Sequence, residues 1–178
     1  QEAIDFFGLD SSKKTVLVIG GSLGARSLNK CIRKNRKRLN DSEIQVIWQC
    51  GKLYHASLSQ LFKLGKYPNI YLHQFIDRMD LAYAAADYII SRSGAISVSE
   101  LCAIGKPVIL VPSPNVTDDH QTKNAMELVE RGAALLVKDS EVKEHLIDKV
   151  FMISKDKELS TSLGVEISKL SITNASEK

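Results

Sequence analysis

Glycines follow the first apolar run of the chain in a pattern suited to holding a phosphate. The run covers residues 15–19, residues 20–24 read Gly-Gly-Ser-Leu-Gly, and a helical pattern follows. Glycine lets the backbone approach a ligand closely and adopt positive φ, and the N-terminus of a helix offers unpaired N–H groups to an anion. The loop lacks the Gly-Lys-Ser/Thr of a P-loop and the spacing of a dinucleotide fingerprint. Two interpretations stay open: a phosphate site, or a turn for tight strand–helix packing.

A second glycine turn follows a later apolar run. Residues 92–94 read Arg-Ser-Gly, and residues 95–100 begin a helical pattern that contains Glu100. A carboxylate in the first turns of a helix could accept two hydrogen bonds from neighbouring ribose hydroxyls. The segment 97–100 also fits a capping box, with Ser97 as the N-cap and Glu100 three residues later. Ribose binding and helix capping are both open at this point.

Two more segments could complete a ligand site. Residues 74–77 read Gln-Phe-Ile-Asp and could form a flat slot for a base, although ordinary core filling is the alternative. Residues 112–121 offer many donors and acceptors, which suit a hydroxyl-rich ligand such as a sugar. Within them, residues 118–120 read Asp-Asp-His, but three consecutive residues seldom chelate one ion, and a helix N-cap is the commoner role.

Alternating strand and helix patterns must position these segments. Strands are predicted at residues 15–19, 44–49, 69–73, 88–91, 107–111 and 134–137, and helices at about 25–38, 55–64, 79–86, 96–104, 121–131, 140–153 and 156–170. Continuous apolar strands that alternate with helices predict an α/β fold: a doubly wound, parallel, six-stranded Rossmann-like sheet. Ligands bind beyond the carboxyl ends of such strands, so we expect the two glycine turns to face one cleft. The second strand ends without the acidic residue that a nicotinamide dinucleotide site uses, which argues against a dehydrogenase.

Composition narrows the classes further. The 178 residues are 44% hydrophobic and 25% charged, typical of one globular domain, and a net charge of +3 is too small to indicate nucleic-acid binding. The three cysteines lack metal-ligand spacing, and no apolar run is long enough to span a bilayer. Residues 30–38 carry six cations, which are either a solvated helix face or a contact for anionic lipid.

Five segments, taken together and in order, resemble a known family. They are residues 20–26, 48–52, 75–79, 92–100 and 120–125. They resemble the C-terminal half of the bacterial MurG family of UDP-GlcNAc:lipid I N-acetylglucosaminyltransferases. The resemblance implies one half of a GT-B fold: residues 1–178 would form a single UDP-sugar-binding domain without the N-terminal acceptor domain. Residues 155–178 would form a C-terminal helical segment that is partly unsupported and mobile at its end.

The resemblance also implies roles for individual residues. The loop with Ser22 would contact the diphosphate, Ile76 would meet the uracil through its backbone, and Glu100 would bind the ribose. Gln121, with His120, would hold the GlcNAc hydroxyls. The full expected donor-binding set is Gly20, Gly21, Ser22, Gly24, Ile76, Arg92, Ser93, Gly94, Ala95, Ile96, Ser97, Val98, Ser99, Glu100, His120 and Gln121. No catalytic residue, metal site or cofactor is assigned, because the general base would lie on the missing domain.

The implied partners are UDP-GlcNAc and, through the missing domain, the lipid I acceptor. We expect no nucleic acid partner. We expect peripheral attachment to the cytoplasmic face of the bacterial plasma membrane, in peptidoglycan synthesis, mainly through the missing domain. Two alternatives stay open: a non-catalytic donor-binding subunit of a two-chain GlcNAc transferase, and a domain similar to UDP-GlcNAc 2-epimerase.

Overall fold

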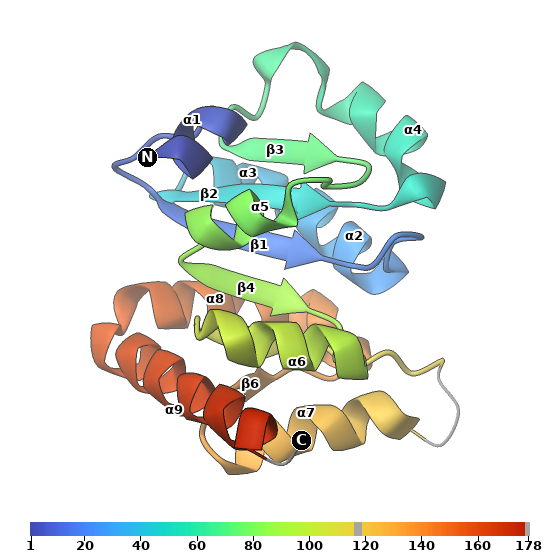
Figure 1. Cartoon of the computed structure of the whole chain (residues 1–178). Coiled ribbons are helices and arrows are strands. Elements are labelled where there is room, and N and C mark those ends of the chain that lie inside the picture. Colours follow the sequence, from blue (N-terminus) through green and yellow to red (C-terminus); the bar gives the residue numbers. More distant parts are fainter. Residues whose placement is uncertain (116–118, 177–178) are drawn as a thin grey trace. The chain divides into compact units, whose positions relative to one another are not determined.

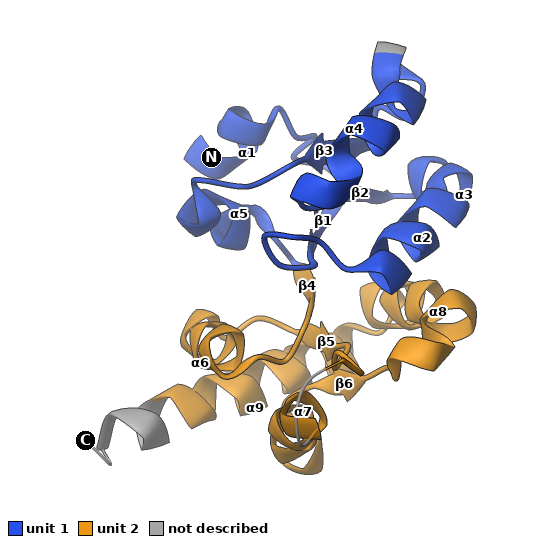
Figure 2. Cartoon of the chain, turned by 90° about the vertical axis from the view of Figure 1, so that its right-hand side faces the viewer, with its two compact units in different colours: residues 1–87 blue, residues 88–178 orange. Residues whose placement is uncertain are grey.

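The computed structural model describes residues 1–115 and 119–176. The chain divides into two compact units, Gln1–Asp87 and Tyr88–Lys178, which Figure 2 colours separately. The strand order is β3-β2-β1-β4-β5-β6, which is the Rossmann order. The strands are β1 (Lys14–Ile19), β2 (Ile44–Gln49), β3 (Ile70–His73), β4 (Tyr88–Ser91), β5 (Val108–Leu110) and β6 (Leu135–Leu136). All six predicted strands are therefore confirmed, and the parallel α/β fold with them.

Unit 1 is a three-stranded parallel layer covered on both faces. Val18 of β1 lies opposite Trp48 of β2, which lies opposite Leu72 of β3, and every residue of β2 is buried. Helices α1 (Glu2–Phe7) and α5 (Met79–Ala85) cover one face, and α2 (Arg26–Lys34) and α3 (Arg36–Asn40) cover the other (Figures 1 and 2). Helix α4 (Lys52–Leu61) and the short η1 (Lys63–Gly65) link β2 to β3.

The prediction of one long helix at residues 25–38 is wrong, because this segment forms two helices, α2 and α3. Asn35, with φ −92° and ψ 11°, separates α2 from α3. Its side-chain amide donates to the carbonyl oxygen of Cys31 at 3.0 Å. Asparagine competes with the backbone for hydrogen bonds in this way, which favours a helix end. Helix α1, six residues long, was not predicted from the sequence at all.

Unit 2 is built on β4, β5 and β6. Helices α6 (Ala95–Ile104) and α9 (Lys157–Ser176) lie side by side, while α7 (His120–Glu130) and α8 (Val142–Lys155) complete the unit with the short η3 (Asp139–Glu141). Leu163 and Ile167 of α9 are buried, so the predicted C-terminal segment is helical and supported at least to Ile167. The expectation of a mobile end falls partly on residues 177–178, which lie outside the described residues.

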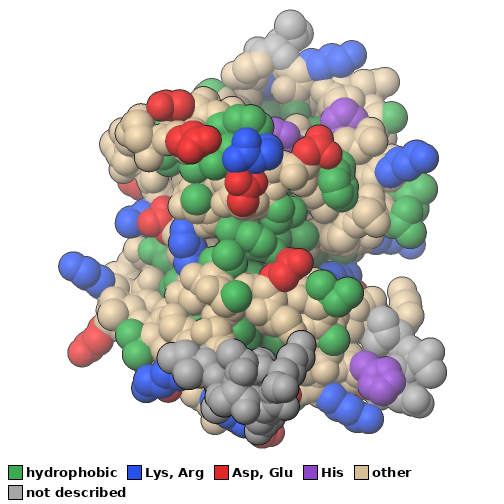
Figure 3. Space-filling model, in the orientation of Figure 1, with side chains coloured by type: hydrophobic (Ala, Val, Ile, Leu, Met, Phe, Trp, Pro, Cys, Tyr) green, Lys and Arg blue, Asp and Glu red, His purple; other side chains and the backbone are tan. Residues whose placement is uncertain are grey.

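The face of the molecule that Figure 3 shows is mixed in charge. Figure 3 shows Lys and Arg side chains interspersed with Asp and Glu on the face in view. No helix in the described part of the chain is both long and apolar enough to cross a bilayer.

Candidate functional site

The loop after β1 combines open glycines with packed ones. Gly21 (φ 86°) and Gly24 (φ 92°) both adopt backbone conformations that favour glycine. A Cβ at Gly24 would overlap the carbonyl oxygen of Cys50, and a Cβ at Gly51 would overlap the backbone of Gly24. A Cβ at Gly21 would meet nothing within 4 Å, and Gly21 and Ser22 are exposed. Tight packing therefore explains Gly24, whereas Gly21 and Ser22 present backbone to solvent or to a ligand.

Helix α2 begins directly after this loop without a capping side chain. Its N-cap is Ala25, which has no side-chain oxygen to accept from the first-turn N–H groups. Those groups and the positive end of the helix dipole suit an anion bound against Ser22. The geometry of this turn is compatible with a bound phosphate, and the phosphate contact stays a prediction.

A buried asparagine holds this turn in place. Asn29 is 3% exposed; it accepts from Trp48 Nε1 at 3.0 Å and donates to the carbonyl oxygen of Cys50 at 2.8 Å. Sequence analysis missed Asn29, although a polar residue on the buried face of a helix was the available signal. Burial also raises the pKa of the Cys50 thiol to about 11, so it stays protonated and unreactive at neutral pH.

The segment predicted to form a slot for a base follows β3 and lies beside a hollow. The N–H of Ile76, which is buried, donates to Gln49 Oε1 at 2.9 Å. A hollow of about 420 Å³ lies beside it and is lined in part by Phe6, His73 and Phe75. Gln49 holds the N–H of Ile76, so a backbone contact of Ile76 with a base would use its carbonyl oxygen, and that contact stays a prediction. Sequence analysis had noted Gln49 only as the missing acid at the end of the second strand.

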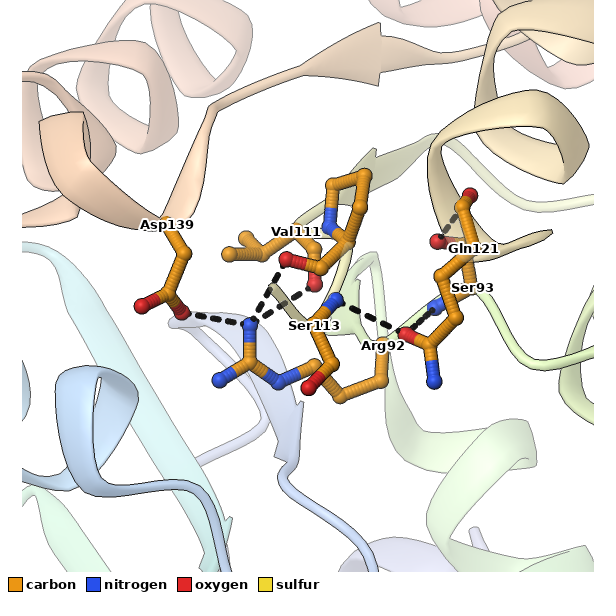
Figure 4. A network of polar contacts seen from close by, with 7 residues as sticks. Arg92, Ser93, Val111, Ser113, Gln121 and Asp139 are labelled. Atoms are coloured by element: carbon orange, nitrogen blue, oxygen red, sulfur yellow. Dashed lines mark hydrogen bonds and ion pairs between the residues drawn. The ribbon is translucent and has the colours of Figure 1, made fainter. Parts of the chain in front are cut away.

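Unit 2 turns Arg92 inward. Its Nη1 donates to the carbonyl oxygens of Val111 at 3.0 Å and Pro112 at 3.2 Å, and pairs with Asp139 Oδ1 at 2.6 Å (Figure 4). Only 16% of the Arg92 side chain and 22% of the Asp139 side chain is exposed. The guanidinium of Arg92 ties the exits of β4 and β5 to η3, and the expected contact of Arg92 with a ligand stays a prediction.

The turn after β4 is tied to the start of α7. Gln121 Oε1 accepts from the N–H of Ser93 at 3.3 Å and from the N–H of Ser113 at 2.9 Å (Figure 4). Ser93 Oγ donates to the Gln121 carbonyl oxygen at 2.7 Å, and Asn124 Nδ2 donates to the Ser93 carbonyl oxygen at 3.0 Å. Ser93 is fully buried, and the bonds above fix it in the fold, while its expected donor contact stays a prediction. The amide nitrogen of Gln121 points away from both bonds and is the group that a ligand would meet.

Helix α6 begins at Ala95, with Gly94 as its N-cap and no capping side chain. Ser97 is therefore the third helical residue and Glu100 the sixth, so the capping-box alternative is wrong. Gly94 has φ −62° and ψ 150°, and a Cβ there would meet only Ser97 Oγ, at 4.0 Å. Neither the backbone nor packing requires glycine here. Ile96 is 79% exposed in the first turn, which is unusual for a large apolar side chain.

The comparisons with known proteins agree with this geometry. The model of the glycosyltransferase family 28 C-terminal domain matches residues 15–168. The chain belongs to this family. An N-acetylglucosamine transferase of Phocaeicola vulgatus, named for UDP-N-acetylglucosamine and N-acetylmuramyl-(pentapeptide) pyrophosphoryl-undecaprenol, is 49% identical over 98% of this chain. The same enzyme of Flavobacterium psychrophilum is 49% identical over 99% of it.

Solved structures place the family 28 domain among glycosyltransferases. The MurG structure from Acinetobacter baumannii is 30% identical, with a TM-score of 0.75, and the match covers 94% of this chain and 48% of that one. A UDP-N-acetylglucosamine 2-epimerase has a TM-score of 0.63 at 16% identity, which shows the shared fold alone. The chain spans about half the length of the curated relatives it matches, 47% in both cases named above.

Within the family 28 domain, each unit gathers part of the predicted set. Unit 1 places the loop with Ser22 and the Ile76 segment at the exits of its strands, joined through the β2 exit. Unit 2 brings Ser93 and Gln121 into direct contact and leaves Glu100 and His120 exposed on α6 and α7. Of the remaining predicted residues, Ala95, Ile96 and Ser99 are exposed, whereas Ser97 and Val98 are half-buried.

No metal centre emerges from the described residues. They contain no group of three or more His, Cys, Asp and Glu side chains that could hold an ion. Asp119 occupies the N-cap position of α7, as the helix-cap interpretation predicted, but makes no side-chain capping bond. Asp118, the other acid of that motif, lies outside the described residues.

Proposed function

We propose that this chain is the UDP-GlcNAc-binding part of an inverting glycosyltransferase. The reaction would move GlcNAc to the 4-hydroxyl of MurNAc in undecaprenyl-pyrophosphoryl-MurNAc-pentapeptide, lipid I, and so make lipid II for peptidoglycan. The family membership and the names of the relatives support the substrates. The acceptor would be bound by polypeptide outside this chain, because the chain matches about half of each relative.

The observation that carries the proposal is a repeated local structure. Helices α2 and α6 each follow a glycine turn and each start on a residue without a capping side chain, Ala25 and Gly94. The first-turn N–H groups of both helices therefore lack a side-chain acceptor. They lie at the exit of a sheet strand, and together with the helix dipole they favour an anionic ligand there. A nucleoside diphosphate sugar needs such groups around its diphosphate and polar side chains around its sugar.

These groups also suit the chemistry. Direct displacement at the anomeric carbon transfers negative charge to the departing UDP, and helix N-termini stabilise that charge without a metal ion. Glu100 would accept hydrogen bonds from the ribose, and the amide nitrogen of Gln121 would donate to a sugar hydroxyl. The base that deprotonates the acceptor hydroxyl must approach from the opposite face of the sugar, so we assign it to the acceptor-binding part. We propose peripheral attachment at the cytoplasmic membrane face for the same complete enzyme.

Calorimetric titration of the chain tests the proposal. UDP-GlcNAc and UDP should both bind saturably at or below millimolar concentration, whereas ADP-glucose, with a different base, should not. The chain alone should transfer no GlcNAc and should not epimerise it. Absence of saturable binding by UDP-GlcNAc would overturn the proposal, and epimerised product would assign the domain to the epimerases instead.

A further inference from the structure

One surface of unit 1 carries a run of positive charge along α2 and α3. Residues 26–40 contain seven cations and no acidic residue, so with a net charge of +3 for the whole chain the remaining residues sum to −4. Six of these cations are exposed. We call them the basic face: Arg26, Lys30, Arg33, Lys34, Lys37 and Arg38.

Local structure displays the basic face as one surface. The opposite side of α2 is buried through Leu28, Cys31 and Ile32, so the exposed side consists of polar residues alone. Helices α2 and α3 lie on the same face of unit 1 (Figure 2). The seventh cation, Arg36, is held at the surface by Tyr67, to whose hydroxyl its Nε donates at 2.8 Å.

Four cations of this face have no acidic partner among the described residues. Lys30, Arg33, Lys34 and Lys37 form no ion pair with any described residue. Lys30 lies four residues from Lys34 and three from Arg33, and like charges at this spacing destabilise a helix. A helix that needed only solubility would intersperse acids here, so the uniform sign points to an anionic partner.

The chemistry of the face identifies the partner class. All residues of 26–40 are described, and none is an exposed large hydrophobic side chain or an aromatic one. Insertion into a bilayer and stacking on nucleic-acid bases both need such side chains. With insertion and base stacking excluded, the interaction that the face can make is electrostatic attraction to an extended negatively charged surface. We propose that the basic face binds the headgroups of anionic phospholipids and holds the donor-binding part against the membrane. This rests on the proposed function in one respect: the relatives' acceptor is carried on undecaprenol, which resides in a membrane.

Vesicle co-sedimentation of the chain tests the proposal without any nucleotide. Binding should appear with vesicles containing phosphatidylglycerol, be absent with pure phosphatidylcholine and fall steeply as salt is raised. Each cation near an anionic surface contributes about fivefold, so Arg33→Gln/Lys34→Gln/Lys37→Gln should weaken binding roughly a hundredfold. The matched control, Lys143→Gln/Lys155→Gln/Lys157→Gln, removes three exposed cations from α8 and α9 of unit 2 and should weaken binding far less.

The outcomes separate this inference from the donor site. Equal losses in the two triple variants would show a response to net charge and overturn the proposal. Tighter binding to a duplex DNA probe than to anionic vesicles would overturn it in favour of nucleic acid. UDP affinity, measured on the same variants, should stay unchanged, so loss of vesicle binding with intact UDP binding concerns the basic face alone. Glutamine is a good helix former, so we expect each variant to fold. Thermal melting checks that it does.

Discussion

Gly94 offers the sharpest test of the donor site, because the fold does not require glycine there. Its φ and ψ suit any residue, and a Cβ would come no closer than 4.0 Å to another side chain, at Ser97. Gly94→Asp places a carboxylate at the N-cap of α6, where it accepts from the N–H groups of Ile96 and Ser97. The same N–H groups are the ones that we propose for the nucleotide.

The two effects of the substitution have opposite signs. A capping oxygen contributes a few tenths of a kcal/mol over glycine, and the loss of glycine freedom in the unfolded chain adds about 0.4–1 kcal/mol. Together they should raise the free energy of unfolding by about 0.5–1.5 kcal/mol, or Tm by roughly 1–6 °C. Losing one charge-assisted hydrogen bond costs the ligand about 1.5–3 kcal/mol, so UDP affinity should fall roughly 10- to 150-fold.

Scanning calorimetry and UDP titration measure both quantities on the same protein. Gly94→Asn caps the helix without adding charge, so it should raise Tm similarly and weaken UDP binding less than Gly94→Asp. Gly94→Ala fills the space but has no capping oxygen, and it should leave UDP affinity within a few-fold. If Gly94→Asp raises Tm and UDP affinity does not change, the N-terminus of α6 does not hold the nucleotide.

Three further predictions concern single side chains. Glu100→Ala should weaken UDP-GlcNAc binding by about 1–3 kcal/mol without lowering Tm; a lower Tm at unchanged affinity would assign Glu100 a structural role instead. Gln121→Glu keeps an oxygen for the N–H groups of Ser93 and Ser113 but removes the donor, so UDP-GlcNAc affinity should fall about tenfold while UDP affinity holds; equal losses for both ligands would contradict a sugar contact. Burial, and then the charge of His55, lower the pKa of His73 below its ordinary 6.5. The unfolded chain therefore binds the proton first, and stability should fall as the pH drops below about 6.5, by at most about 1.4 kcal/mol per pH unit. His73→Phe should remove that part of the pH dependence in urea unfolding curves, and an unaltered dependence would refute the assignment.

The strands were predictable because each contains a short apolar run, and most of those in β1, β2, β4 and β5 are buried. β2 was predicted at 44–49 and spans those residues, since every one of its side chains is buried. Helix ends were less predictable, because they depend on single residues: Asn35 divides one predicted helix through a bond to Cys31. For residues 97–100 the sequence left ribose binding and helix capping both open, and only the structure, with Gly94 as the N-cap, excludes a cap at Ser97.

Polar partners at the site could not be read from sequence, because they join segments far apart along the chain. Gln49 and Ile76 are 27 residues apart, and Arg92 and Asp139 are 47 apart. Arg92 belongs to a glycine turn that resembles a ligand-binding motif, so sequence analysis expected it to face the ligand. The carbonyl oxygens at the end of β5 need donors, however, and the guanidinium supplies them.

The structure shows why each glycine of the two turns is needed or not needed by the fold. Gly24 is required by the fold, because a Cβ there would collide with the carbonyl group of Cys50. Position 21 favours glycine because of its positive φ, although the space around it is open. Position 94 needs glycine neither for its backbone angles nor for its packing. Gly94 stands at the start of a helix without a capping side chain, so substitutions there change the helix cap without straining the backbone or the packing. Gly94 is therefore the residue at which the structural and the ligand-binding interpretations of the turn predict different experimental results.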